Sequence, residues 1–215
     1  MKLSVTALSL FSVLQLALTA PLPSNPTHLY PHDQPPPHPT RSNPKTPTTS
    51  VPPYSIAETI RYRKSQYSRF SDTAQWPLFS ALLHPSLTAS FHNPNGSLIV
   101  SPADGFEYSF SSREDYVEFW SRSNAGSRTI HVVGPGELSM LGEGEDGDGD
   151  EISAVWGVSW LAQTGSLETG VSSGNRIGVG LGGGHYHEVW RRVEGEWVIV
   201  DLKLVLAFNT VIPVV

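Results

Sequence analysis

The chain has 215 residues, with 18 prolines, 19 glycines, no cysteine and a formal net charge of −6. The lack of cysteine excludes a disulfide scaffold, a thiolate nucleophile and metal sites built from thiolates. The 14 Lys and Arg residues are scattered along the chain, so no nucleic-acid-binding face is predicted. Hydrophobic residues make up 39% of the chain, which is enough for a buried core in one domain.

Residues 1–20 have the pattern of a secretory signal peptide. A lysine precedes an apolar run, and small residues close the segment. Because the run is short and contains several polar residues, cleavage is favoured over a membrane anchor. We therefore expect a secreted protein that has no membrane attachment after cleavage. Asn95 opens an N-glycosylation sequon, Asn95-Gly96-Ser97, which suits that route and predicts a glycoprotein.

Residues 21–54 predict a disordered, proline-rich linker. They contain 12 of the 18 prolines, which are incompatible with a helix interior or a central strand. Such a segment favours extended polyproline conformations and behaves as a semi-rigid spacer.

Three helices are predicted, over residues 56–70, 76–83 and 113–122. The first is introduced by Ser55 and Glu58, a serine followed three residues later by glutamate, which is typical of a capping box. Its apolar residues fall near one face, and Lys64 and Ser68 are expected elsewhere on the helix. Pro85 is expected to end the second helix. Ser112 and Asp115 form a similar capping pair before the third.

The second half of the chain predicts strands. Apolar and β-branched residues, separated by glycine-rich turns, indicate strands over residues 88–92, 129–133, 137–141, 152–163, 176–193 and 197–208. The strand over 176–193 is rich in glycine, which favours strong curvature or bulges. Helices followed by long antiparallel strands predict an α+β fold with a curved sheet around helices.

Three segments resemble the SnoaL-like branch of the nuclear-transport-factor-2-like superfamily, and scytalone dehydratase in particular. They are residues 184–197 (GHYHEVWRRVEGEW), residues 72–85, and residues 127–131 (SRTIH). The resemblance implies one domain over residues 55–211. It also implies a cone-shaped, antiparallel or mixed sheet packed on three N-terminal helices, with a pocket inside. Members include dehydratases, isomerases, cyclases and non-catalytic binders, and none of this chemistry needs a cofactor.

The resemblance places His131 and Asp72 at the positions of a catalytic histidine and its aspartate partner. A carboxylate that accepts the ring N–H fixes the tautomer and lets the other ring nitrogen exchange protons. Taken singly, His131 also fits a hydrogen-bonded core histidine, and Asp72 also fits a carboxylate in a loop between helices.

Five further side chains are expected at the pocket. By the resemblance, Tyr186 and Glu188 face it, and Phe91 also lies there; Glu188 fits the wet rim of the sheet equally well. Trp156 and Trp160 share one strand face, so they either line the pocket or cover an outer face in a dimer.

No metal site is expected. His185 and His187 share a strand face but have no third ligand. The acidic run over residues 143–151 resembles a calcium loop, yet Glu151 holds the position that requires glycine and Gly157 the position of the closing carboxylate. A solvated hairpin loop is the expectation there.

Several positions depart from the scytalone dehydratase pattern. Ser71 and Phe91 stand where that enzyme has two tyrosines, and Ala162 stands where it has a second histidine. Gly184 and Tyr186 replace a serine and an asparagine. Two hypotheses follow: a cofactor-independent lyase, isomerase or cyclase acting on a small cyclic or polyketide-like molecule, or a non-catalytic module. The module would bind a small hydrophobic or aromatic ligand, or pair as a homodimer through the sheet face.

Overall fold

The computed structural model describes residues 50–143, 150–164 and 178–213. The predicted signal peptide, nearly all of the predicted linker and residues 144–149 of the acidic run lie outside these ranges. Within them, the helices are α2 (Tyr54–Asp72), α3 (Trp76–Ser80) and α4 (Arg113–Ser123). The strands are β1 (Leu83–His92), β2 (Ser109–Phe110), β3 (Ser127–Val133), β4 (Glu137–Glu143), β5 (Asp150–Thr164), β6 (Gly178–Val193) and β7 (Glu196–Pro213).

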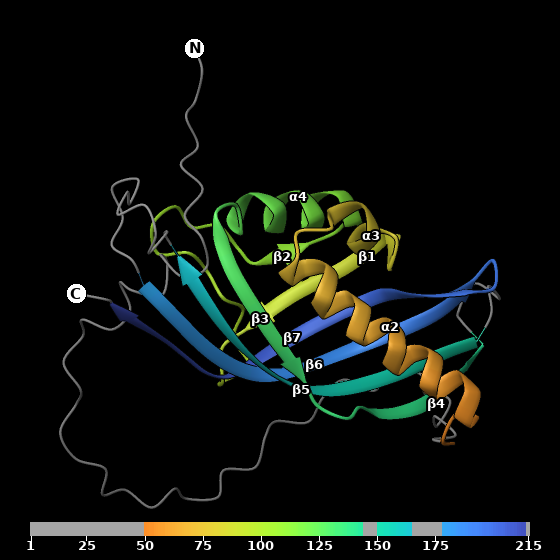
Figure 1. Ribbon diagram of the computed structural model, residues 1–215. Helices are drawn as coiled ribbons and strands as arrows, with labels where there is room; N and C mark the ends of the chain where they lie inside the picture. Colours follow the sequence, from red (N-terminus) through yellow and green to blue (C-terminus); the bar gives the residue numbers. More distant parts are fainter. Residues whose placement is uncertain (1–49, 144–149, 165–177, 214–215) are drawn as a thin grey trace, which may run out of the picture.

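The strands form one curved, mixed sheet, and the helices lie against one side of it (Figure 1). The order is β2-β1-β7-β6-β5-β3. Strand β4 also pairs with β5, along the half that β3 leaves open. Strands β1 and β7 are parallel, and the other pairs are antiparallel. The prediction of an α+β fold with a curved sheet is therefore confirmed.

Glycines in β6 allow the sheet to bend. The register between β6 and β7 shifts between Gly183 and Gly184. A Cβ atom at Gly184 would lie 2.2 Å from the carbonyl oxygen of Val205, so no other residue fits there without a backbone shift. The bulge therefore confirms the interpretation of this glycine-rich strand.

Two predictions about element boundaries were wrong. The helix α2 begins at Tyr54, so Ser55 lies inside it and makes no capping bond with its side chain. Glu58 instead pairs with Arg61. Pro85 does not end a helix but lies within β1, where the pairing with β7 is irregular between Leu83 and Thr88. A proline is tolerated there because it does not have to donate a regular ladder bond. Ser112, by contrast, does cap α4 through the backbone N–H of Asp115.

The inward face of α2 is more polar than the sequence indicates. Ile60 and Tyr67 are buried as expected, but Lys64 and Ser68 are buried beside them. These positions follow the three- and four-residue spacing of one helical face. The helix therefore presents a lysine, a tyrosine and a serine to the interior.

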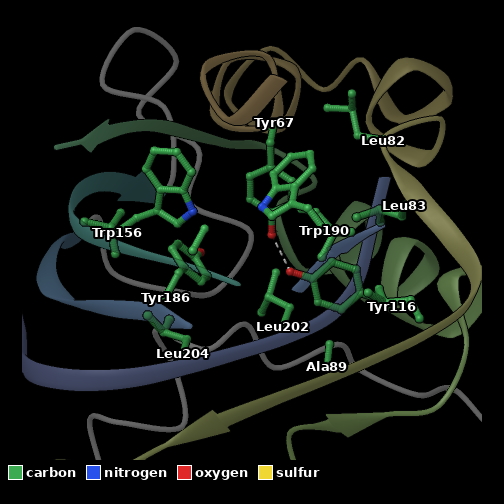
Figure 2. Packing of buried hydrophobic residues seen from close by; sticks show 14 of the residues in the cluster. Tyr67, Leu82, Leu83, Ala89, Tyr116, Trp156, Tyr186, Trp190, Leu202 and Leu204 are labelled. Carbon is green, nitrogen blue, oxygen red and sulfur yellow. Dashed lines mark hydrogen bonds between the residues drawn. The ribbon is translucent and has the colours of Figure 1, made fainter. Parts of the chain in front are cut away.

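Large aromatic side chains fill the space between helices and sheet (Figure 2). Trp190 is fully buried, and Trp156 is 2% exposed. A Cβ atom at Gly136 would fall 2.2 Å from the Trp156 ring, so this glycine makes room for the indole. Leu202 and Ile199 of β7 complete the base of the core.

Candidate functional site

Asp72 and His131 form a hydrogen-bonded pair. Asp72 is the last residue of α2, and His131 lies in the middle of β3. The Asp72 Oδ1 atom lies 2.6 Å from His131 Nδ1, and Asp72 Oδ2 accepts the backbone N–H of His131 at 2.9 Å. The hydroxyl of Thr129 donates to Oδ1 at 2.8 Å. The carboxylate is thus held from two positions of β3 and orients the ring.

The hydrogen bonds around Asp72 favour its ionised form. Burial alone would raise the pKa of this carboxyl, but the hydrogen bonds and charge of His131, with that of Thr129, outweigh it and lower the pKa below its usual value. An ionised Asp72 accepts the Nδ1–H of His131. The Nε2 atom is then the ring nitrogen that remains for exchange of a proton with a ligand.

A cavity opens beside this pair, between the helices and the sheet. Its volume is about 70 Å³, enough for several water molecules. Most of the wall is aromatic or aliphatic. The lining residues are Tyr67, Ser68, Ser71, Phe79, Phe91, Tyr116, Trp120, Asn124, Thr129, His131, Trp160, Tyr186, Leu204, Leu206 and Asn209.

The structure brings four of the residues predicted for the site to this cavity and leaves three out of its lining. His131, Phe91, Tyr186 and Trp160 all line it. Asp72 supports His131 from behind. Glu188, expected at the pocket or at the wet rim of the sheet, does not line the cavity, and neither does Trp156, expected in the pocket or on an outer face. Both are buried deeper, because the Glu188 carboxylate turns toward α2 and the Trp156 indole turns toward Glu188.

Glu188 belongs to a buried ionic network rather than to the wet rim of the sheet. Its Oε1 atom pairs with the ammonium of Lys64, and both side chains are at most 1% exposed. Its Oε2 atom accepts the indole N–H groups of Trp156 at 2.8 Å and Trp190 at 2.9 Å. Desolvation lowers the pKa of Lys64, and Glu188 opposes that shift. Each charge is thus satisfied inside the core.

The Lys64 ammonium also lies against two rings of the site. It is 4.2 Å from the ring centroid of Tyr67 and 3.8 Å from that of Tyr186. Cations over aromatic faces at this distance are attracted by the ring quadrupole. The ionic network therefore fixes Tyr67 and Tyr186 from behind the cavity wall.

Three phenols converge on the cavity. The hydroxyls of Tyr67 and Tyr116 lie 2.6 Å apart and share a hydrogen bond (Figure 2). Burial raises the pKa of Tyr67, Tyr116 and Tyr186 above the usual value, and neighbouring charges raise it further. All three remain protonated at neutral pH, so they are hydrogen-bond donors as well as acceptors.

Sequence reasoning missed Tyr67, Tyr116 and Lys64 as parts of the site. Ser71 and Phe91, which the resemblance aligns with two tyrosines of scytalone dehydratase, both line the cavity. Phenols are instead supplied from one helical turn earlier on α2 and from α4. The three- and four-residue spacing of Lys64, Tyr67 and Ser71 was the available signal, since it places them on one face.

The remaining predicted features lie on the surface. His185 and His187 are exposed on the opposite face of β6. Within the described ranges, no three His, Cys, Asp or Glu side chains are grouped as metal ligands. Asn95 is exposed in a turn, where its Oδ1 atom accepts the Ser97 hydroxyl at 2.7 Å. None of the helices in these ranges has the length and hydrophobicity needed to cross a bilayer.

Solved structures with the same fold are distant in sequence. A Kribbella flavida protein, Kfla4162, aligns with a TM-score of 0.55 and 16% identity over 73% of this chain and 93% of its own. A type 2 hexachlorocyclohexane dehydrochlorinase, LinA, aligns with a TM-score of 0.53 and 15% identity over 75% of this chain and 91% of its own. A Novosphingobium aromaticivorans protein, provisionally assigned as a scytalone dehydratase, aligns with a TM-score of 0.53 and 15% identity over 75% of this chain and 90% of its own. These similarities establish the fold alone.

Sequence comparison goes further. The Probable cyclase FGR4 of Gibberella zeae is 38% identical over 148 residues, which cover 69% of this chain and 89% of that protein. The family model of the SnoaL-like domain matches residues 55–203, which include all three helices and the strands up to most of β7. The chain belongs to the SnoaL-like domain family.

Proposed function

We propose that the protein is a cofactor-independent acid–base catalyst, of the cyclase, isomerase or lyase type, acting on a small hydrophobic ring-containing molecule. The observation that carries this proposal is the Asp72–His131 pair at the wall of an otherwise aromatic cavity. The name of the Gibberella zeae relative supports a cyclase within this group.

In this proposal His131 is the residue that moves protons. Its Nε2 atom removes a proton from the ligand, and Asp72 stabilises the imidazolium that forms. Where the proton comes from a carbon beside a carbonyl, the electron pair moves to the carbonyl oxygen. Protonated phenols at the cavity wall are suited to donate hydrogen bonds to that oxygen. His131 then returns the proton to the product.

A general probe of a pocket base tests this without knowledge of the natural substrate. In 5-nitro-1,2-benzisoxazole, removal of the ring C–H proton breaks the nitrogen–oxygen bond and releases a coloured phenolate. We expect the protein to accelerate this reaction and His131→Ala to lose about 10²–10⁴-fold of the acceleration. Asp72→Asn is expected to fall between the two, because the ring loses its fixed tautomer.

The matched control is His185→Ala, which removes an exposed histidine from the outer face of β6. It should retain the wild-type rate. A rate at the buffer background for the wild-type protein, or equal rates for wild type and His131→Ala, would refute the acid–base proposal.

A non-catalytic binder is the second candidate. It is favoured by the cavity wall, which apart from His131 is mainly aromatic and aliphatic. A protein that binds small aromatic molecules with unchanged affinity in His131→Ala, and accelerates no proton transfer in either form, would be this binder.

The outer sheet face is proposed to pair two copies of the chain. Ile130, Val132 and Leu161 are 52–62% exposed, and Phe208 and Ile212 are about half exposed. Register places Ile130 directly opposite Leu161, so these side chains form a contiguous apolar surface. A homodimer in sedimentation equilibrium that Val132→Lys dissociates would support pairing, and a wild-type monomer at high concentration would refute it.

Secretion and glycosylation are proposed from the N-terminal pattern and the sequon at Asn95. The exposed turn that holds Asn95 is accessible to a bulky sugar. Expression of the full chain in a eukaryotic secretory host should deliver protein to the medium. Endoglycosidase treatment should reduce its mass, and Asn95→Gln should abolish that reduction. Retention of the full chain in the cytosol would refute secretion.

A further inference from the structure

Three phenols and one indole are linked by hydrogen bonds at the cavity wall. The hydroxyls of Tyr67 and Tyr116 lie 2.6 Å apart, and either of them can donate to the other. The indole N–H of Trp120 donates to the Tyr116 hydroxyl. The Tyr67 hydroxyl donates to that of Tyr186. All four residues line the cavity, so the chain of hydrogen bonds follows its surface.

The number of protons gives this chain a direction. An indole nitrogen can only donate, and each phenol has one proton to donate. Because Tyr67 donates to Tyr186, the 2.6 Å contact between Tyr67 and Tyr116 is filled by the Tyr116 proton. The hydrogen bonds then run from Trp120 through Tyr116 and Tyr67 to Tyr186. The proton of Tyr186 is left over, and it is available to a group in the cavity.

The buried ion pair presents its positive member to the end of this chain. The Lys64 ammonium lies 3.8 Å from the ring centroid of Tyr186 and 4.2 Å from that of Tyr67. The negative charge of Glu188 is shared with two indole N–H groups. A cation over the face of a phenol stabilises the negative charge that grows on its oxygen as it donates a hydrogen bond. Lys64 therefore strengthens Tyr186 as a donor.

Tyr186 stays protonated, so it acts as a hydrogen-bond donor and not as an anion. Burial and the charge of Glu188 raise its pKa above the usual value, and the hydrogen bond from Tyr67 opposes that rise. Hydrogen bonds in a chain polarise one another. The terminal donor is therefore strengthened by the hydrogen bonds behind it.

Tyr186 and His131 reach the cavity from separate strands. Register pairs Tyr186 with Trp156 and His131 with Trp160, both on β5. At about 3.4 Å per residue, these two positions are roughly 13 Å apart along the strand. The donor and the base therefore meet different atoms of a ligand, as removal of a proton at one atom and growth of charge at another require.

We infer that Tyr186 is the donor that stabilises the oxyanion of the proposed reaction, and that Lys64, held by Glu188, is a positioning residue acting through it. As His131 takes a proton from carbon, the electron pair moves to the carbonyl oxygen. The Tyr186 hydroxyl donates a hydrogen bond to that oxygen and keeps its proton. This inference rests on the proposed function, which it deepens by naming the donor and its support.

A phenolate is a stable substitute for that oxyanion, so binding tests the inference without turnover. Above the pKa of 4-nitrophenol, its phenolate carries the negative oxygen, and 4-nitrotoluene has the same shape without it. Calorimetry measures both affinities. We expect Tyr186→Phe to weaken 4-nitrophenolate about 10- to 100-fold and to leave 4-nitrotoluene unchanged. Tyr116→Phe should weaken the phenolate less, because it removes a link behind the donor. Tyr62→Phe, at an exposed tyrosine of the same helix, should change neither affinity.

The role of the ion pair is tested with both of its charges removed. Lys64→Met/Glu188→Gln should weaken 4-nitrophenolate about 3- to 10-fold and leave 4-nitrotoluene unchanged. The same two changes should have no further effect in Tyr186→Phe, because Lys64 acts through that phenol. A merely structural role would weaken both ligands. Lys64→Gln/Glu188→Gln, in which two amides replace the charges, is the second neutral version, and unfolding curves establish that each variant is folded.

The outcomes separate this inference from the proposed function. The preference for 4-nitrophenolate should persist in His131→Ala, because the donor is a phenol and not an imidazolium. Loss of the preference in His131→Ala, or a larger effect of Tyr116→Phe than of Tyr186→Phe, would overturn the inference while the proton-transfer assay could still succeed. A failed proton-transfer assay with the predicted preferences would overturn catalysis and leave Tyr186 as the donor to a bound oxyanion. Equal affinity of the wild-type protein for the two ligands, or no binding of 4-nitrophenolate, would overturn the inference.

Discussion

Replacing Glu188 by glutamine should expose how strongly the buried ion pair is coupled. Lys64 and Glu188 are at most 1% exposed, so the variant leaves an ammonium in the core without its counter-charge. Loss of one partner of a buried pair costs about 3–5 kcal/mol. The indoles of Trp156 and Trp190 also exchange a charged acceptor for a neutral one. We therefore expect Glu188→Gln to lose at least about 3 kcal/mol of unfolding free energy.

The double variant Lys64→Met/Glu188→Gln distinguishes a missing counter-charge from a general packing defect. Methionine fills much of the lysine volume without a charge, and glutamine can still accept from an indole. Replacement of a whole buried pair by neutral groups is often close to neutral. The double variant should therefore be more stable than Glu188→Gln alone, and the two single losses should not add.

Urea unfolding followed by circular dichroism and tryptophan fluorescence measures the cycle, with unchanged m-values as the check that the compared states are alike. The loss in Glu188→Gln should also shrink above neutral pH. The pKa of Lys64 is already lowered by burial and falls further without Glu188. Between the folded and unfolded pKa values the unfolded chain binds more protons, so stability rises with pH. Additive losses within about 0.5 kcal/mol would refute the coupling.

Three further changes test other parts of the structure. The wild-type protein should exceed Asp72→Asn in unfolding free energy by a constant amount above about pH 4. This difference should decline as the pH falls through the lowered folded pKa of Asp72, and a pH-independent difference would contradict this. Gly182→Ala should cost about 1–3 kcal/mol because its Cβ meets an indole ring at 2.3 Å, whereas Gly157→Ala, with open space, should cost nothing measurable; equal melting temperatures would contradict this. Tyr67→Phe should cost about 0.5–1.5 kcal/mol in urea unfolding, because it removes the buried hydrogen bond between the Tyr67 and Tyr116 hydroxyls; an unchanged unfolding free energy would contradict this.

The strands and helices could be predicted because their local signals agree with the tertiary structure. Alternating apolar residues predict strands, Ser112 predicts the start of α4, and the glycines of β6 predict its bulge. The Ser55 cap was wrong because the helix begins one residue earlier, at Tyr54, and Glu58 pairs with Arg61 instead. Pro85 was misjudged because an irregular ladder in β1 accommodates it.

The candidate site could be predicted from the sequence only in part. His131 and Asp72 were found from the family resemblance, and the structure places them 2.6 Å apart. Glu188 was expected at the pocket because alternation along β6 predicts the face of the sheet on which a side chain lies, but not how deeply it is buried. Its partner Lys64 is 124 residues away in sequence, and no local pattern indicates that a lysine is buried.

The single helix α2 sets the alignment of both the core and the cavity. Lys64 anchors it to Glu188, and two turns later Asp72 anchors it to His131. One residue inserted between these anchors would rotate the second about 100° relative to the first. Insertion of a whole turn would restore the direction but move Asp72 about 5.4 Å along the helix axis, so the number of residues between the two anchors is fixed if both contacts are to survive. Within α2, substitution rather than a change of length is therefore the way to alter the cavity wall while keeping both contacts.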